Sequence, residues 1–353
     1  MHRNAACLYV AALLVAVISA SAVAAPAGPG LDEEAIEQRI VEYLGQLKDA
    51  ETSEELFAAR NQLISDYQFY RKNNRGVLYG TIFTKRAVPV LADLANEPQK
   101  QVNLGIAARN ITEATISGMY YEMGKHRNPS LRYLAWQGFA RRVWPMVLNQ
   151  GMGAAQRLVN QAGAQLQKET DPLVVNELIR LLGFNPPENL SIPGAPLSRA
   201  RDLSLTQIAQ RAPMILTQVR KGQPQFTQAG LIFVNDCYAS LYQQAQIDQA
   251  DATQLNQIMV DLMMQAALAY DDSEGQGMLP KMQLLLLARA EDALIRTLQT
   301  GNNRINALLQ NPTNTLKVDL IQAVLDWVAD IKQKHPQVKD PTDLAKAQNS
   351  GQG

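Results

Sequence analysis

The sequence predicts an all-α protein built from antiparallel helix pairs. Good helix formers dominate, because Gln is about one residue in ten, Ala and Leu are frequent, and aromatic residues make up only 6%. Apolar side chains recur at intervals of three and four residues along most of the chain, as on one face of an α-helix. Capping residues, Pro and Gly interrupt this pattern repeatedly. We therefore expect many helices of ordinary length joined by turns.

Residues 1–24 are typical of a cleavable secretory signal. Arg3 precedes an apolar run from Ala5 to Ile18, and small residues follow. Ala22-Val23-Ala24 offers small side chains where a signal peptidase reads, so we expect cleavage near Ala24. The run of about 14 apolar residues is shorter than the roughly 20 that a membrane-spanning helix needs. We expect an exported mature chain, in the periplasm or outside the cell, with no membrane span after cleavage.

The first pair of helices is expected directly after a short Pro/Gly stretch. Asp32 is a candidate N-cap for a helix with an apolar stripe of Ile36, Ile40, Leu44 and Leu47. Thr52 and Glu55 fit a capping box, and the stripe of the second helix is Leu56, Ala59, Leu63, Tyr67 and Tyr70. Two amphipathic helices with a short polar link make an antiparallel pair.

Further helix starts follow before position 183. A helix is expected over about Val77–Asn96, and Pro89 inside it should bend it. Pro98, Pro129 and Pro172 then mark three new starts, because Pro suits the first turn of a helix. Each start is followed by apolar residues at helical spacing.

The start at Asn128-Pro129-Ser130-Leu131-Arg132-Tyr133-Leu134-Ala135 resembles the second helix of HEAT and armadillo-type repeats. Asp171-Pro172 opens a similar helix 43 residues later, within the roughly 40–47 residues of one such repeat. Ala154–Gln167 fits the first helix between them, whereas Pro98 lies only 31 residues before Pro129. The resemblance spans roughly Val77 to Gly183.

This resemblance implies a HEAT-like α-solenoid of stacked helix pairs in the first half, residues 31–183. An irregular helical bundle is the alternative. Residues 184–201 are rich in Pro and predict a linker or a long exposed loop. Longer helices are expected over 202–334, either as a bundle packed against or linked to the first half or as more repeats. Residues 335–353 are polar and predict a flexible tail.

Charge balance excludes one class of partner. Acidic and basic residues number 33 each, so the chain lacks the basic surface expected of a nucleic-acid binder. No segment after the signal is long and apolar enough to cross a membrane. We therefore expect no nucleic-acid partner, and we treat another protein or a peptide as the candidate partner.

The sequence predicts no metal site, no cofactor and no catalytic residues. Only His126 and His335 remain after signal cleavage, and neither has neighbours with zinc-ligand spacing. Residues 272–283 resemble a calcium loop faintly, but Gln283 stands where a bidentate Glu is required. Met259 and Met263 lie one helical turn apart, a spacing that core packing explains. Cys237 is expected to be a buried, unreactive thiol.

We therefore expect an exported, non-catalytic helical-repeat protein that acts as a protein- or peptide-binding scaffold of the cell envelope. Arg132, Tyr133 and Arg141 are the candidate partner-binding residues on a concave face. Two alternatives stay open, namely a helical enzyme with scattered catalytic residues and a purely structural envelope protein.

Overall fold

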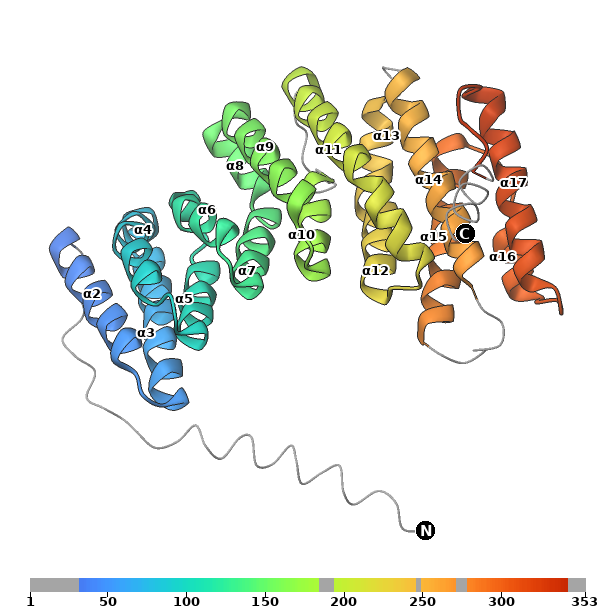
Figure 1. Ribbon diagram of the computed structural model, residues 1–353. Helices are drawn as coiled ribbons and strands as arrows, with labels where there is room; N and C mark the ends of the chain where they lie inside the picture. The colour runs from blue at the N-terminus through green and yellow to red at the C-terminus, as the bar shows by residue number, and fades with distance from the viewer. Residues whose placement is uncertain (1–31, 184–193, 246–248, 271–277, 342–353) are drawn as a thin grey trace, which may run out of the picture.

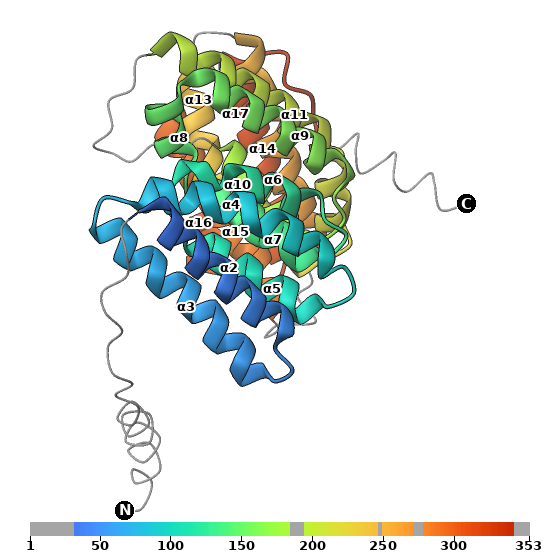
Figure 2. The same ribbon diagram turned by 90° about the vertical axis from the view of Figure 1, so that its left-hand side faces the viewer.

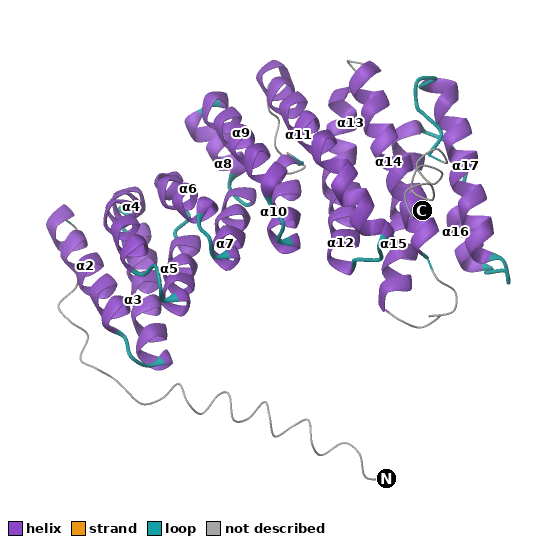
Figure 3. Cartoon of the chain, in the orientation of Figure 1, coloured by secondary structure: helices purple, strands orange, loops and turns teal. Residues whose placement is uncertain are grey.

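A computed structural model describes residues 32–183, 194–245, 249–270 and 278–341 (Figure 1). All regular structure in these ranges is helical (Figure 3). None of the helices in them is long and apolar enough to span a lipid bilayer. The expected signal, most of the Pro-rich segment and the end of the chain lie outside the described residues.

The helices before the Pro-rich segment are joined by short turns. They are α2 Glu33–Asp49, α3 Ser53–Lys72, α4 Gly76–Asp93, α5 Pro98–Asn110, the 3-10 turn η1 Ala114–Ile116, α6 Ser117–Lys125, α7 Pro129–Ala140, α8 Val143–Gln150, α9 Met152–Lys168 and α10 Pro172–Leu182. Asp32, Thr52, Asn128 and Asp171 cap α2, α3, α7 and α10 through their side chains. Pro89 lies inside α4 without ending it.

The second half contains helices of 27, 21, 21 and 19 residues together with shorter ones. They are α11 Gly194–Arg220, α12 Pro224–Ile232, the π-helical segment η2 Phe233–Tyr238, α13 Ala239–Ala245, α14 Gln249–Ala269, α15 Met278–Leu298, α16 Ile305–Gln310 and α17 Leu316–Lys334. Residues 224–245 therefore form one continuous helical stretch with a π-helical middle. Since α11 begins at Gly194, the last part of the expected 184–201 linker is helical.

The helices form two layers that follow one curved stack from α2 to α17 (Figure 1). In the first layer, packing contacts join α2 to α4, α4 to α6, α9 to α11, α11 to α14, and α14 to α17. In the second layer they join α3 to α5, α5 to α7, α7 to α10, α10 to α12, and α12 to α15. Figure 2 views this stack from the end that carries α2 and α3. The pairwise order of contacts continues past the Pro-rich segment into the second half.

Basic side chains bond free carbonyl groups at the ends of first-layer helices or directly after them. Lys100 Nζ donates to the Lys48 carbonyl at 2.6 Å. Arg132 Nη1 donates to the carbonyls of His126 and Arg127 at 3.0 and 2.9 Å. Arg211 Nη1 donates to the Gln167 carbonyl at 3.0 Å. The last four carbonyl groups of a helix have no hydrogen-bond partner within the helix, and the helix dipole also favours a cation at this end.

The start of the expected tail is packed onto the stack. Val338 is buried, and the Tyr242 hydroxyl and His335 Nε2 lie 3.2 Å apart. The Lys339 N–H donates to Gln257 Oε1 at 2.6 Å, which ties the chain after α17 to α14. Residues 335–341 are therefore ordered against the core, and residues 342–353 lie outside the described ranges.

Close packing of α7 on α6 depends on Gly138. A Cβ atom at this position would lie 2.5 Å from Cζ of the fully buried Tyr120 ring. We expect Gly138→Ala to lower the free energy of unfolding by about 2 kcal/mol, as in other overpacked cores. The matched control is Gly45→Ala on α2, where no atom lies within 4 Å of the added Cβ. Urea unfolding should show the control more stable than the original by about 0.5–1 kcal/mol, and equal effects at both sites would contradict this packing.

Candidate functional site

A groove crosses the first turns of four successive second-layer helices, α3, α5, α7 and α10. It consists of three adjoining hollows of about 570, 430 and 240 Å³. The first two share Ser53, Leu56, Pro98 and Gln99, and the last two share Val102 and Ser130. Loops at the lower ends of α3, α7, α10 and α12 mark this edge of the stack in Figure 3. We call this surface the groove.

Each of the four helices contributes a partly exposed apolar side chain to the groove. Phe57 on α3 is 46% exposed, and Leu173 on α10 is 55% exposed. Val102 on α5 and Tyr133 on α7 are half-buried between them. These side chains form an apolar row across the helices, in addition to the stripes that face the core.

Hydrogen-bonding groups without a partner lie beside this row. The side chains of Ser53, Gln99 and Ser130 line the groove and form no hydrogen bond within the described part of the chain. The N-cap of α5, Glu97, accepts no hydrogen bond from the backbone N–H groups of its helix, although the caps of α3, α7 and α10 do. Because Pro98 has no N–H, the first free donor of α5 is the N–H of Gln99, which lies at the groove.

Exposed carboxylates border the α3 end of the groove. Glu51, Glu54 and Glu55 are all exposed, and we call them the acidic rim. The N–H groups of Glu51 and Thr52 donate to the Glu55 carboxylate and lower its pKa. The carboxylates of Glu51 and Glu54 have no ion pair or hydrogen bond among the described residues. Two cations at this end already have partners. Lys100 is paired with Glu97 at 2.5 Å, and Arg60 lies over the Phe57 ring at 4.9 Å and donates to Asn103 Oδ1 at 3.0 Å.

The three residues predicted from the sequence to bind a partner occupy different environments. Arg132 is not exposed, because its guanidinium forms a bidentate ion pair with Glu169 at 2.7 and 2.8 Å. Tyr133 lines the groove, and its hydroxyl accepts a hydrogen bond from Gln137 at 2.7 Å. Arg141 is exposed but follows the other end of α7, about 12 Å along the helix axis from Tyr133. Only Tyr133 therefore belongs to the groove.

Sequence reasoning missed Phe57 and Leu173. Both lie outside the apolar stripe with which their helix packs against the core. In the sequence they stand next to buried members of that stripe, Leu56 and Val174. An exposed apolar residue in the first two turns of a helix is the signal that could have identified them. One such residue is common on protein surfaces, and only the stacking of the helices aligns several.

The buried carboxylates of the described chain do not converge on a catalytic centre. Asp66 pairs with Arg39, Glu169 with Arg132, and Glu177 with Arg180. Glu291 accepts hydrogen bonds around the start of α16. Within the described residues, no group of three or more His, Cys, Asp or Glu side chains is placed to hold a metal ion. The weak calcium-loop resemblance falls largely on residues 271–277, which are not described.

Asp261 on α14 is a buried carboxylate without a basic partner. Burial raises its pKa from 3.8 to about 6, although Gln257 Nε2 donates to it at 2.9 Å. The pKa of Asp261 is higher in the folded protein than in the unfolded chain, so protonation of this carboxyl group stabilises the fold. This stabilisation is complete below pH 3.8 and is lost as the pH rises through about 6. We expect Asp261→Asn to raise the free energy of unfolding at pH 7.5 by on the order of 2 kcal/mol.

The difference between Asp261→Asn and the original chain should vanish near pH 3.5. Thermal unfolding from pH 3.5 to 8 measures this dependence. The control is the half-buried carboxylate Asp326, which accepts a hydrogen bond from Gln322, and Asp326→Asn should show no comparable pH-dependent gain. A gain for Asp261→Asn that is equal at both ends of the pH range would contradict the assignment.

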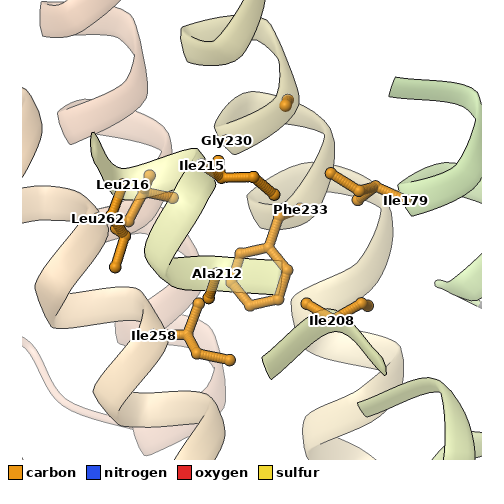
Figure 4. Close-up of a pocket in the computed structure, with 10 residues that line it drawn as sticks. Ile179, Ile208, Ala212, Ile215, Leu216, Gly230, Phe233, Ile258 and Leu262 are labelled. Carbon is orange, nitrogen blue, oxygen red and sulfur yellow. The ribbon is translucent and has the colours of Figure 1, made fainter. Parts of the chain in front are cut away.

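A second cavity lies between α10, α11, α12 and α14 and is entirely apolar (Figure 4). Its volume is about 20 Å³, and its walls include Ile179, Ile215, Phe233, Ile258 and Leu262. A space of this size, with no polar atom to hold a water molecule, is a gap in packing rather than a ligand site.

The sulfur-containing residues of the second half lie in the core. Cys237 is fully buried in the π-helical segment, and burial raises the pKa of its thiol far above the usual value. Its Sγ donates to the Ile179 carbonyl at 3.3 Å. Met259 and Met263 are completely buried in α14. None of these side chains is exposed for a partner or a metal ion.

No protein family, no curated protein and no solved structure matches this chain. The residues themselves therefore carry the functional argument.

Proposed function

We propose that this chain is an exported, HEAT-like α-solenoid that binds another protein or a peptide in the groove. The observation that carries the proposal is the row of Phe57, Val102, Tyr133 and Leu173, one residue from each of four stacked helices. Side chains of this kind, partly exposed and aligned in a hollow, supply apolar area for a partner. Stacked helix pairs are a common way to build an extended binding surface.

The repeat character is supported by the starts of the second-layer helices. Pro98, Pro129, Pro172 and Pro224 each occupy the first position of their helix, and Pro280 lies in the first turn of α15. Their spacings are 31, 43, 52 and 56 residues. The intervals vary because the first-layer helices and the connecting segments differ in length. These shared proline starts support one helix-pair unit repeated with irregular spacing.

Export is supported by the N-terminal sequence alone. The charged, apolar and small-residue zones of residues 1–24 follow the order of a secretory signal. N-terminal sequencing of the protein purified from its native cells tests this part. The expected mature N-terminus lies within two residues of Ala25, and a retained Met1 would contradict export by this route.

The binding function is tested by affinity capture from the native envelope fraction. The bait is the mature chain, and the groove variant carries Phe57→Asp and Leu173→Asp at two exposed positions. The control carries Val77→Asp and Val318→Asp, which are exposed on first-layer helices. We expect the same partner with the original and control chains and at least a tenfold loss with the groove variant. Equal recovery with all three baits would contradict binding in the groove.

A further inference from the structure

The geometry of the groove favours an extended occupant. Packed helices lie about 8–10 Å apart, and the groove offers one apolar side chain per helix. A polyproline II chain has three residues per turn and advances about 3.1 Å per residue, so one turn covers one helix and side chains three positions apart lie on the same face. Ten or so residues in this conformation cross all four helices. An apolar side chain at every third position would then meet Phe57, Val102, Tyr133 and Leu173 in turn.

Free hydrogen-bonding groups in the groove also favour an extended chain. Ser53, Gln99 and Ser130 have no partner for their side chains within the described residues, and the N–H of Gln99 is left uncapped. An extended peptide exposes its backbone N–H and C=O groups to such side chains. An α-helical partner would satisfy most of these backbone groups internally and leave the groove's donors and acceptors to water.

The charge of the groove differs between its two ends. The acidic rim lies at the α3 end, where Glu51 and Glu54 have no basic partner among the described residues. Glu54 lies three residues before Phe57, so the two side chains are neighbours on one face of α3. At the α10 end, Asp171 lines the groove and its Oδ1 accepts from the N–H groups of Leu173 and Val174, so this end carries one lining carboxylate against the three of the acidic rim. A complementary partner therefore carries its positive charge over α3.

We propose that the partner is an extended, basic segment of another protein, with apolar side chains about three residues apart and Lys or Arg at the end that lies over α3. This inference rests on the proposed function, because it names the class of segment that the same groove binds. The apolar side chains of the groove provide contact area for the segment, and the free polar groups form hydrogen bonds with its backbone. The acidic rim determines in which direction the segment lies across the helices.

The test is selection from a random 12-residue peptide library displayed on phage. The mature chain is the target, and the Phe57→Asp, Leu173→Asp variant removes peptides that bind elsewhere. We expect selected peptides to share a Lys or Arg near one end and apolar residues at every third position. Groove-dependent peptides are those that bind the original chain but not the variant. If they are acidic, or lack this spacing, they would overturn the inference while leaving groove binding intact. Failure to select any groove-dependent peptide would overturn the inference and the proposed function together.

A charge-reversal variant tests the direction of binding. Glu51→Lys with Glu54→Lys changes two exposed side chains, so the fold should be retained. We expect the affinity of a selected basic peptide, measured by fluorescence polarisation, to fall at least tenfold. The same peptide with its basic residues replaced by Gln should bind both proteins equally. An unchanged affinity of the basic peptide would show that the acidic rim does not contact it.

Discussion

Glu169→Ala is expected to lower the free energy of unfolding by about 3–5 kcal/mol, because removing one partner of a buried ion pair leaves the other uncompensated. Glu169 is 2% exposed and receives the bidentate guanidinium of Arg132. Its carboxylate also accepts from Gln165 Nε2 at 2.8 Å and from the N–H groups of Thr170 and Asp171 at 3.1 and 3.0 Å. The substitution therefore disrupts the α9–α10 turn and its link to α7 together.

The pH dependence of this effect follows from the pKa of Glu169. Burial acts to raise this pKa, but the hydrogen bonds from Arg132, the Asp171 N–H and Gln165 lower it overall. A lowered pKa means that the stabilisation is present at neutral pH and is lost as the pH falls through the folded-state value. Urea unfolding at pH 7 measures the effect, and Glu122→Ala is the control, since its pair with Lys125 is exposed. A loss below 1 kcal/mol for Glu169→Ala would contradict this role.

Glu291→Ala is expected to destabilise the end of the stack by about 3–5 kcal/mol through the loss of a buried charged cap. The Glu291 side chain is fully buried. It accepts from the N–H groups of Arg304, Ile305 and Asn306 at 2.8, 2.8 and 2.7 Å, and from Trp327 Nε1 at 2.8 Å. One carboxylate therefore starts α16 and holds α17 against α15.

The loss should be local to the C-terminal end. Hydrogen exchange should show faster exchange over α16 and α17 in Glu291→Ala, while α2 to α5 keep their protection. Glu291→Gln is the conservative comparison, because its amide oxygen still accepts hydrogen bonds but lacks the charge, and its effect should be smaller. Uniform loss of protection along the whole chain would contradict a local cap.

Local sequence signals predicted the helices of the first half well. Asp32 and Thr52 cap helices as expected, and helices begin at Pro98, Pro129 and Pro172 as expected. Short helices such as α8 and α16 were missed, because fewer than three turns give too little apolar periodicity to detect. The sequence also did not predict that the stack continues through the second half. Long connections between helix pairs change the spacing of the proline starts in the sequence without changing how the pairs pack.

The site was only partly predictable, for a physical reason. Whether an Arg is exposed depends on its partner, and the partner of Arg132 lies 37 positions away at Glu169. Conversely, Phe57 and Leu173 become a site only through stacking that aligns their helices. Tyr133 was predicted and does line the groove. Spatial alignment between helix pairs of irregular length cannot be derived from one sequence.

Photo-crosslinking in the native cells tests the central claim, that the groove is the partner-binding surface. A photoreactive phenylalanine analogue is placed at Leu173 in the groove or at Val77 on a first-layer helix, both of which are exposed. We expect a defined crosslinked adduct from position 173 that is absent from position 77, with a partner segment that is basic and apolar by mass spectrometry. Identical adducts from both positions, or none from position 173, would contradict the claim.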